Sequence, residues 1–219
     1  MSAADDTVDP AGHPTRRALL RTALAGAIAA FATPAAGAAP ASGATGLTAN
    51  DIAILQFDLV LEELQAALYS EAERLGALSP RTLGWARVVG AHERAHARAI
   101  RALLGPAAAP SPSFDFRGVT EREDRFLKTA VAFEDLTAAL LKWQAVRLDS
   151  RAVVAAVATL HSVETRHAAW IRHIVGIPPA TSAFDHPAPQ ARMADLVQRT
   201  GFIVSRPHTA RSGRPRFTG

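Results

Sequence analysis

Apolar residues recur at spacings of three and four over most of the chain between residues 50 and 176. This spacing places apolar side chains on one face of an α-helix. Residues that favour turns interrupt it at three places and so divide the segment into four long stretches. We therefore predict four helices, over residues 50–75, 80–104, 120–148 and 150–176.

Residues at the ends of these stretches set the predicted limits. Ser79 is a good N-cap, and Pro80 follows it at the first helical position, where a missing N–H does no harm. Thr120 and Glu123 have the spacing of a capping box. The remaining predicted N-caps are Asn50 and either Asp149 or Ser150, and the helices end at Gly76, Gly105 and Gly176. A short fifth helix is predicted near residues 190–200.

The connections between the helices predict how they are arranged. The first and third are short, so the helices they join must be antiparallel neighbours. The middle connection, Pro106 to Val119, has fourteen residues and at roughly 3.1 Å per residue reaches about 43 Å. A helix of about 26 residues is near 39 Å long. The loop can therefore cross the whole bundle, which makes the second and third helices parallel. An up-down-up-down bundle stays open as the alternative.

No segment alternates polar and apolar residues between hairpin turns, so the fold class is all-α, with little support for a sheet. We predict a four-helix bundle with one long crossover over residues 49–177. A linker precedes it over residues 39–48, and a C-terminal extension with a basic tail follows over residues 178–219.

Two of the helices carry the same pair of polar residues. Glu93 and His96 lie three residues apart, as do Glu164 and His167, so each pair occupies one helix face. Apolar residues at helical spacing flank both pairs, which turns the pairs toward the core. The flanking residues are Val89, Ala97 and Ile100 for the first pair, and Leu160, Ala168 and Ile171 for the second.

The other two helices each place one glutamate in an apolar stripe, Glu62 between Leu59 and Ala66, and Glu134 between Ala130 and Ala138. A buried carboxylate without a partner is costly, so a cation is expected near both. The order Glu, Glu-x-x-His, Glu, Glu-x-x-His is the pattern of a dinuclear metal site in a bundle core. The predicted metal ligands are Glu62, Glu93, His96, Glu134, Glu164 and His167.

Composition narrows the chemistry further. The chain has 219 residues, 48% of them hydrophobic, which is enough for one domain with a sizeable core. It has no cysteine, and this excludes disulfides, thiolate zinc sites and iron–sulfur clusters. Four carboxylates and two imidazoles suit two iron or two manganese ions, and the site's charge would neutralise two divalent cations.

The first 38 residues predict export. Thr15 precedes Arg16 and Arg17, an apolar stretch follows over residues 22–32, and small residues near 36–38 offer a cleavage site. This resembles a twin-arginine signal peptide. We expect a periplasmic or extracellular protein. The apolar stretch is too short to span a bilayer, so no stable membrane span is expected in the mature form.

Net charge does not change this picture. The chain carries a formal charge of +4, and the arginines of residues 180–219 account for the excess. A basic tail that contains proline is more typical of a solvated extension than of an arm for nucleic acid, so no nucleic-acid partner is expected. The sequence leaves oligomerisation open.

Over roughly residues 51–185 the chain resembles the exported ferritin-like domain proteins that include desiccation-related proteins. The resemblance rests on residues 61–69, 92–96, 133–135, 163–167 and 183–185. It implies a ferritin-like bundle and a non-haem di-iron or di-manganese carboxylate site. The ligand types favour an oxidoreductase-type site that reacts with oxygen or peroxide. Ferroxidases and manganese catalases belong to the wider group, so the resemblance implies no single reaction. The chain departs from the family at Gln65 and Ala67, where acidic residues are common.

Two other functions stay open at this stage. One is a non-catalytic, stress-associated structural or metal-binding protein of the desiccation type. The other is a zinc metallopeptidase, because His92-Glu93-x-x-His96 matches its signature. That signature leaves the carboxylates of the other helices unexplained.

Four residues near the predicted ligands have two interpretations each. Asp58 and Asp135 are candidates to hold ligand imidazoles. His161 suits a polar core position better than a ligand position. Tyr69 suits core packing, with a hydrogen bond to a ligand carboxylate as the second interpretation.

Overall fold

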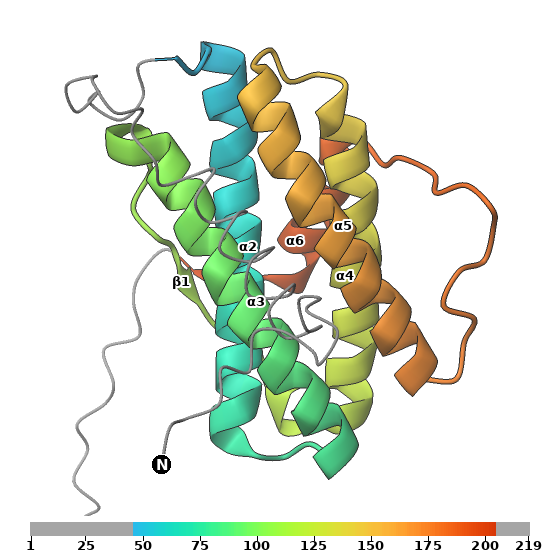
Figure 1. Ribbon diagram of the computed structural model, residues 1–219. Helices are drawn as coiled ribbons and strands as arrows, with labels where there is room; N and C mark the ends of the chain where they lie inside the picture. Colours follow the sequence, from blue (N-terminus) through green and yellow to red (C-terminus); the bar gives the residue numbers. More distant parts are fainter. Residues whose placement is uncertain (1–45, 205–219) are drawn as a thin grey trace, which may run out of the picture. The chain divides into compact units, whose positions relative to one another are not determined.

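The computed structural model describes residues 46–204, so the predicted export signal and the end of the basic tail lie outside the described residues. Four long helices dominate this part of the chain. They are α2 (Ala49–Leu75), α3 (Pro80–Leu104), α4 (Glu123–Ala145) and α5 (Arg151–Ile174). They pack in pairs as a bundle, so the predicted all-α fold is confirmed (Figure 1). None of the helices in residues 46–204 has the length and apolar character needed to cross a membrane.

Contacts between helices give their directions. Glu62 meets His96 and Tyr69 approaches Gly90, so α2 and α3 are antiparallel. Glu134 contacts His167, and Lys142, eight residues later, lies close enough to His161 to affect its charge, so α4 and α5 are antiparallel as well. Between α3 and α4 the chain returns along the whole bundle, and these two helices run parallel as predicted (Figure 1).

The crossover is more structured than its sequence suggested. It contains two 3₁₀ helices, η1 (Gly105–Ala107) and η2 (Val119–Glu121), and the short strand β1 (Ser113–Phe114). The strand β2 (Ile203–Val204) pairs with β1 in antiparallel fashion. This ladder is too short to show the alternation by which strands are recognised in a sequence.

The helix N-termini confirm two predicted caps, Ser79 for α3 and Ser150 for α5, and correct two. Ser79 caps α3 as predicted, accepting from the amide of Thr82 at 3.4 Å. Asn50 was wrong as the first cap, because the side chain of Thr48 accepts from the amide of Asp51 at 3.0 Å. Asn50 already lies in the helix and donates to the Arg147 carbonyl at 2.7 Å.

The predicted capping box at Thr120 is also wrong. Thr120 lies in η2, and its hydroxyl donates to Glu71 at 2.5 Å. The Glu123 carboxylate accepts from Ser79 instead, so both residues tie the start of α4 to the neighbouring helices. Because Thr120 and Glu123 bind residues that are distant in sequence rather than each other, α4 begins at Glu123 and not at Thr120.

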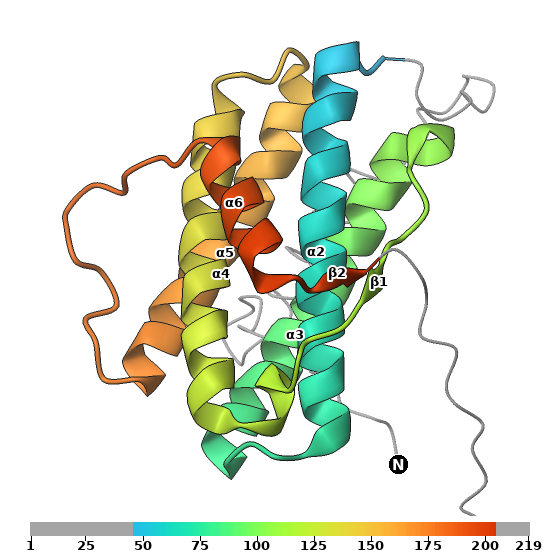
Figure 2. The same ribbon diagram turned by 180° about the vertical axis from the view of Figure 1, so that it is seen from behind.

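The short C-terminal helix α6 (Gln190–Thr200) is present over the predicted residues. It packs on α4, and the chain then reaches β2 beside the crossover (Figure 2). Met193 and Phe202 are buried in the same core as the bundle. Part of the predicted extension therefore completes the core.

The core has an aromatic end and an aliphatic end. The aromatic end is built around Tyr69, Trp85, Phe126 and Phe133. The aliphatic end contains Leu55, Leu59, Ile100, Leu104, Leu141, Val153 and Val157. Each large side chain buried in this way contributes about 1.5–3 kcal/mol. Each long helix passes from one end to the other, and its polar ligand candidates lie between the two.

Candidate metal centre

The structure brings all six predicted side chains together in the middle of the bundle. They form two groups, and within each group one ligand atom from every residue lies within 4.8 Å of the others. One group is Glu62, Glu93, His96 and Glu164, and the other is Glu93, Glu134, Glu164 and His167. Glu93 and Glu164 belong to both groups, so the two positions are adjacent.

Local sequence explains how each helix presents these groups. Residues three apart lie on one helix face, so Glu93 points the same way as His96, and Glu164 the same way as His167. Buried Val89 and Ala97 lie one turn to either side of Glu93. Ala168 and Ile171 continue the buried face of α5. The apolar stripe therefore turns the polar residues inward, as the sequence predicted.

The first imidazole contacts three carboxylates. Nδ1 of His96 lies 2.9 Å from Oε1 of Glu164, 3.3 Å from Oε2 of Glu62 and 3.8 Å from Oε2 of Glu93. This nitrogen, rather than Nε2, is therefore the one directed into the centre.

The second imidazole repeats the arrangement. Nδ1 of His167 lies 3.1 Å from Oε1 of Glu93, 3.4 Å from Oε2 of Glu164 and 3.5 Å from Oε2 of Glu134. Glu93 and Glu164 thus turn one oxygen toward each imidazole. A carboxylate placed in this way can bridge two cations, whereas Glu62 and Glu134 each belong to one group only.

Burial and mutual contact shift the protonation of these groups. The pKa of Glu62 lies well above its usual value, first because of burial and then because of the charge of Glu93. Burial raises the pKa of Glu134 to about 8. Burial opposes ionisation of Glu93 too, but the imidazoles of His167 and His96 outweigh it and lower its pKa to about 2.

The imidazoles respond in the opposite direction. Burial favours their neutral forms, yet the surrounding carboxylates raise the pKa of His167 to about 12 and strongly raise the pKa of His96. The cluster therefore requires positive charge among its carboxylates. Protons supply that charge when a metal ion does not, and metal binding must displace them.

The unpaired atoms of the cluster fit a metal ion. Oε1 and Oε2 of both Glu93 and Glu164 are buried without a hydrogen-bond partner, and so are Nδ1 of both imidazoles. Several of these atoms lie within ion-pair distance of one another, but their directions do not form hydrogen bonds. Buried polar atoms normally have partners, so atoms that converge without pairing are suited to a shared cation.

The comparison with known families agrees with this geometry. Residues 50–177 match the ferritin-like domain family, which is more than half of the chain. The chain belongs to the ferritin-like family. A comparison with curated proteins finds none that matches it. The ferritin-like bundle therefore contains buried Glu/His clusters consistent with a dinuclear metal site.

Tyr69 supports one ligand of this ferritin-like centre. Its side chain is fully buried and its hydroxyl donates to Oε1 of Glu134. Its ring packs edge-on against Trp85 with centroids 5.3 Å apart. Both interpretations of this residue from the sequence are therefore correct, since it packs in the core and also contacts a ligand carboxylate.

His92 is a neighbour of the ligand candidates that the sequence indicated only through the alternative zinc-peptidase signature. Its Nδ1 lies 2.9 Å from Nε2 of His167, on the side of the imidazole away from the carboxylates. His92 is exposed and belongs to neither ligand group. A zinc signature of the peptidase type would need His92 and His96 to serve the same ion, whereas these two imidazoles face different partners.

Asp58 and Asp135, the two candidates to hold ligand imidazoles, have other partners. Asp58 accepts from the Gln144 amide at 2.8 Å. Asp135 accepts from Nε and Nη2 of Arg172 at 2.6 and 2.7 Å. Neither aspartate contacts His96 or His167 in the part of the chain that the structure describes.

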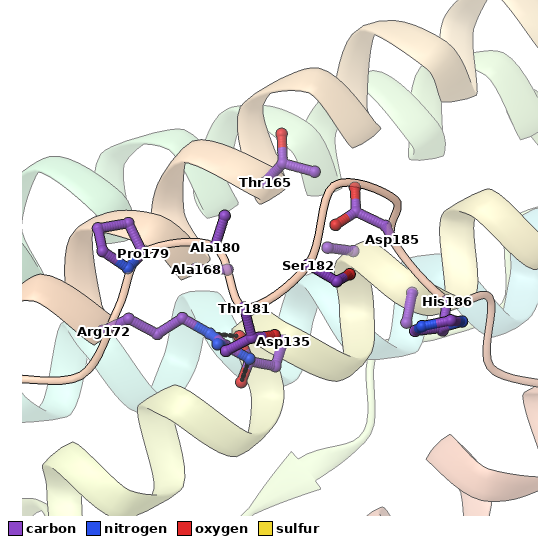
Figure 3. A pocket seen from close by; sticks show the side chains of 12 residues that line it. Asp135, Thr165, Ala168, Arg172, Pro179, Ala180, Thr181, Ser182, Asp185 and His186 are labelled. Carbon is purple, nitrogen blue, oxygen red and sulfur yellow. Dashed lines mark hydrogen bonds and ion pairs between the residues drawn. The ribbon is translucent and has the colours of Figure 1, made fainter.

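The Asp135–Arg172 pair lies at the wall of a separate cavity of about 220 Å³ between α4, α5 and the segment after α5 (Figure 3). Thr165 and Ala168 line this cavity from α5, whereas none of the six ligand candidates does. His161 belongs to neither ligand group, and its Nε2 is buried without a partner. The six ligand candidates thus form a cluster in the core that is separate from this cavity.

Proposed function

We propose that this chain is an exported ferritin-like protein whose centre holds two iron or two manganese ions and reacts with oxygen or peroxide in a redox or stress role. The observation that carries the proposal is the placement of Glu93 and Glu164, each with one oxygen near His96 and the other near His167. Four carboxylates and two imidazoles are a hard to borderline donor set that suits these metals.

The residues have separate tasks in this proposal. Glu93 and Glu164 would bridge the two ions, and Glu62 with His96 and Glu134 with His167 would complete the two positions. Bound iron or manganese supplies the reversible change of oxidation state that the side chains lack. The apolar ends on both sides keep bulk water from the centre, which strengthens every charge interaction within it.

Metal content tests the ligand set directly. The purified protein should contain about two iron or manganese ions per chain, and Glu93→Ala should remove most of both because a shared ligand is lost. Glu134→Ala should weaken one position. Glu63→Ala is the matched control, since Glu63 is next to Glu62 but pairs with Arg101. One zinc per chain that is insensitive to Glu134→Ala would refute the dinuclear proposal.

Redox turnover tests the activity separately. Protein loaded with Fe(II) without air should consume oxygen or peroxide, and protein loaded with Mn(II) should be assayed for peroxide loss. Glu62→Ala should suppress the reaction while circular dichroism shows that the helices stay folded. If the wild type binds both ions but reacts with neither oxidant, the non-catalytic stress protein becomes the better assignment.

Export is proposed from Arg16 and Arg17, which lie outside the described residues. Twin-arginine recognition requires this pair. Replacing both with lysine should retain the precursor inside the cell in a fractionation experiment. Normal secretion of this variant would refute the proposed route without affecting the metal proposal.

A further inference from the structure

The two metal positions differ in what surrounds them. At the position of Glu134 and His167, both ligands that serve only that position have a partner on their outer side. Tyr69 donates to Glu134, and His92 meets His167. At the position of Glu62 and His96, the structure of residues 46–204 contains no hydrogen bond to Nε2 of His96.

The contact of His92 with His167 is well aligned. Nδ1 of His92 and Nε2 of His167 are 2.9 Å apart, the ring planes differ by 16°, and the centroids are 5.1 Å apart. The centroid separation exceeds the nitrogen separation by about two ring radii, so the rings meet edge to edge. This geometry suits a linear N–H···N hydrogen bond.

The direction of this bond follows from the other side of the His167 ring. Its Nδ1 faces Glu93, Glu134 and Glu164, and this nitrogen must be unprotonated to bind a metal ion. Nε2 then carries the hydrogen and donates to Nδ1 of His92. A partner of this kind fixes the tautomer and the orientation of a ligand imidazole.

We infer that His92 is a positioning residue that holds His167 for metal binding, and that it makes the position of Glu134 and His167 the tighter of the two. The inference rests on the proposed dinuclear centre and adds an order of filling to it. His92 is exposed, so its replacement should not disturb the core. Its effect must pass through His167.

Cobalt(II) is a suitable probe, because its visible absorption reports coordination. Titration of the full-length chain should show two binding steps. His92→Leu should weaken the tighter step by about 10- to 100-fold, and His92→Asn should restore most of it, since the asparagine oxygen can accept from Nε2 of His167. His173→Leu is the matched control, because His173 is exposed on α5 and belongs to neither ligand group.

Two further variants, each of which leaves one metal position complete, show to which position the weakened binding step belongs. With Glu62→Ala only the position of Glu134 and His167 remains complete, and His92→Leu should still weaken it. With Glu134→Ala only the position of His96 remains complete, and His92→Leu should leave it unchanged. Equal weakening in both backgrounds, or no rescue by asparagine, would overturn the inference.

Different results would refute the dinuclear centre and the role of His92. A wild-type chain that binds no cobalt refutes the dinuclear proposal and the positioning role with it. A wild-type chain that binds two ions, with His92→Leu unchanged in both steps, refutes only the role of His92. Circular dichroism and an unchanged unfolding midpoint confirm that the leucine variant is folded.

Discussion

The aromatic end and the metal centre lie side by side on the same four helices, and both are buried, but they are built in opposite ways. At the aromatic end, Tyr69, Trp85 and Phe126 pack edge to face with centroids 5.3 to 6.3 Å apart. This is a favourable arrangement for aromatic rings, and among these three side chains Nε1 of Trp85 is the one buried polar atom without a hydrogen-bond partner in residues 46–204. The centre instead holds eight nitrogen and oxygen atoms of its six ligand candidates without hydrogen-bond partners.

The difference separates the source of stability from the source of function. Apolar burial at the two ends holds the helices in place, whereas the centre brings carboxylates close together and lowers stability unless positive charge is present. Places where a sequence departs from the rules of good packing are often functional. The comparison predicts that changes at the aromatic end affect folding first, and that changes at the centre affect metal binding first.

The largest effect on stability is expected at the aromatic end. Phe126→Ala should lower the free energy of unfolding by about 3–5 kcal/mol, because it removes a fully buried ring and leaves a cavity. The loss should be similar with and without metal, since both forms contain this packing. Urea denaturation measures it. A loss confined to the metal-free protein would show that the aromatic end does not hold the fold independently of the centre.

A smaller effect is expected at Asp58, a buried carboxylate whose hydrogen-bond partner is the neutral amide of Gln144. Burial raises its pKa from 3.8 to about 7, partly offset by the hydrogen bond from Gln144. Between pH 3.8 and about 7 the folded form therefore keeps a proton on Asp58 that the unfolded form has already lost. The stabilisation from this proton is complete below pH 3.8 and is lost as pH rises through about 7.

Asp58→Asn should remove this dependence while keeping the contact with Gln144. The variant should be more stable than the wild type above pH 7 by up to about 4 kcal/mol, because each tenfold change in proton affinity corresponds to about 1.36 kcal/mol. Unfolding midpoints from pH 4 to 8 measure the difference. Asp124→Asn is the control, because Asp124 is exposed. Parallel pH profiles for wild type and Asp58→Asn would contradict the assignment.

Much of the fold and of the site could be predicted from sequence because the signals are local. A Glu-x-x-His pair within an apolar stripe determines which face of a helix is buried, and the lengths of the connections determine which helices are antiparallel. Together these predict that Glu62, Glu93 and Glu134 meet although they lie on different helices. Ser79 and Pro80 show that a helix cap can also be predicted when its partner is a neighbour in sequence.

The rest depends on contacts between distant residues. The α4 start was misplaced because Thr120 and Glu123 bind Glu71 and Ser79, which no local pattern reveals. The outer partner of His167 was missed for the same reason, since His92 precedes it by 75 residues. The sequence did contain a signal for this contact, because His92 lies one turn before His96 on α3. The same spacing is also the signature of zinc peptidases, and it was interpreted in that way.

Tyr69→Phe gives the smallest effect and tests the boundary between the two regions, because Tyr69 has its ring in the aromatic end and its hydroxyl on Glu134. Phenylalanine keeps the ring, so the packing with Trp85 and Phe126 should be unchanged. Burial raises the pKa of Glu134 to about 8, so in the metal-free protein at pH 7 the lost bond joins two neutral groups. Its loss should cost about 1 kcal/mol of unfolding free energy.

With metal bound, Glu134 is ionised and loses a donor, so affinity should fall at the position of Glu134 and His167 alone. Thermal unfolding without metal and a cobalt titration measure the two effects on the same variant. A loss of several kcal/mol without metal would contradict a bond between two neutral groups, and unchanged cobalt affinity would show that Tyr69 does not support the centre.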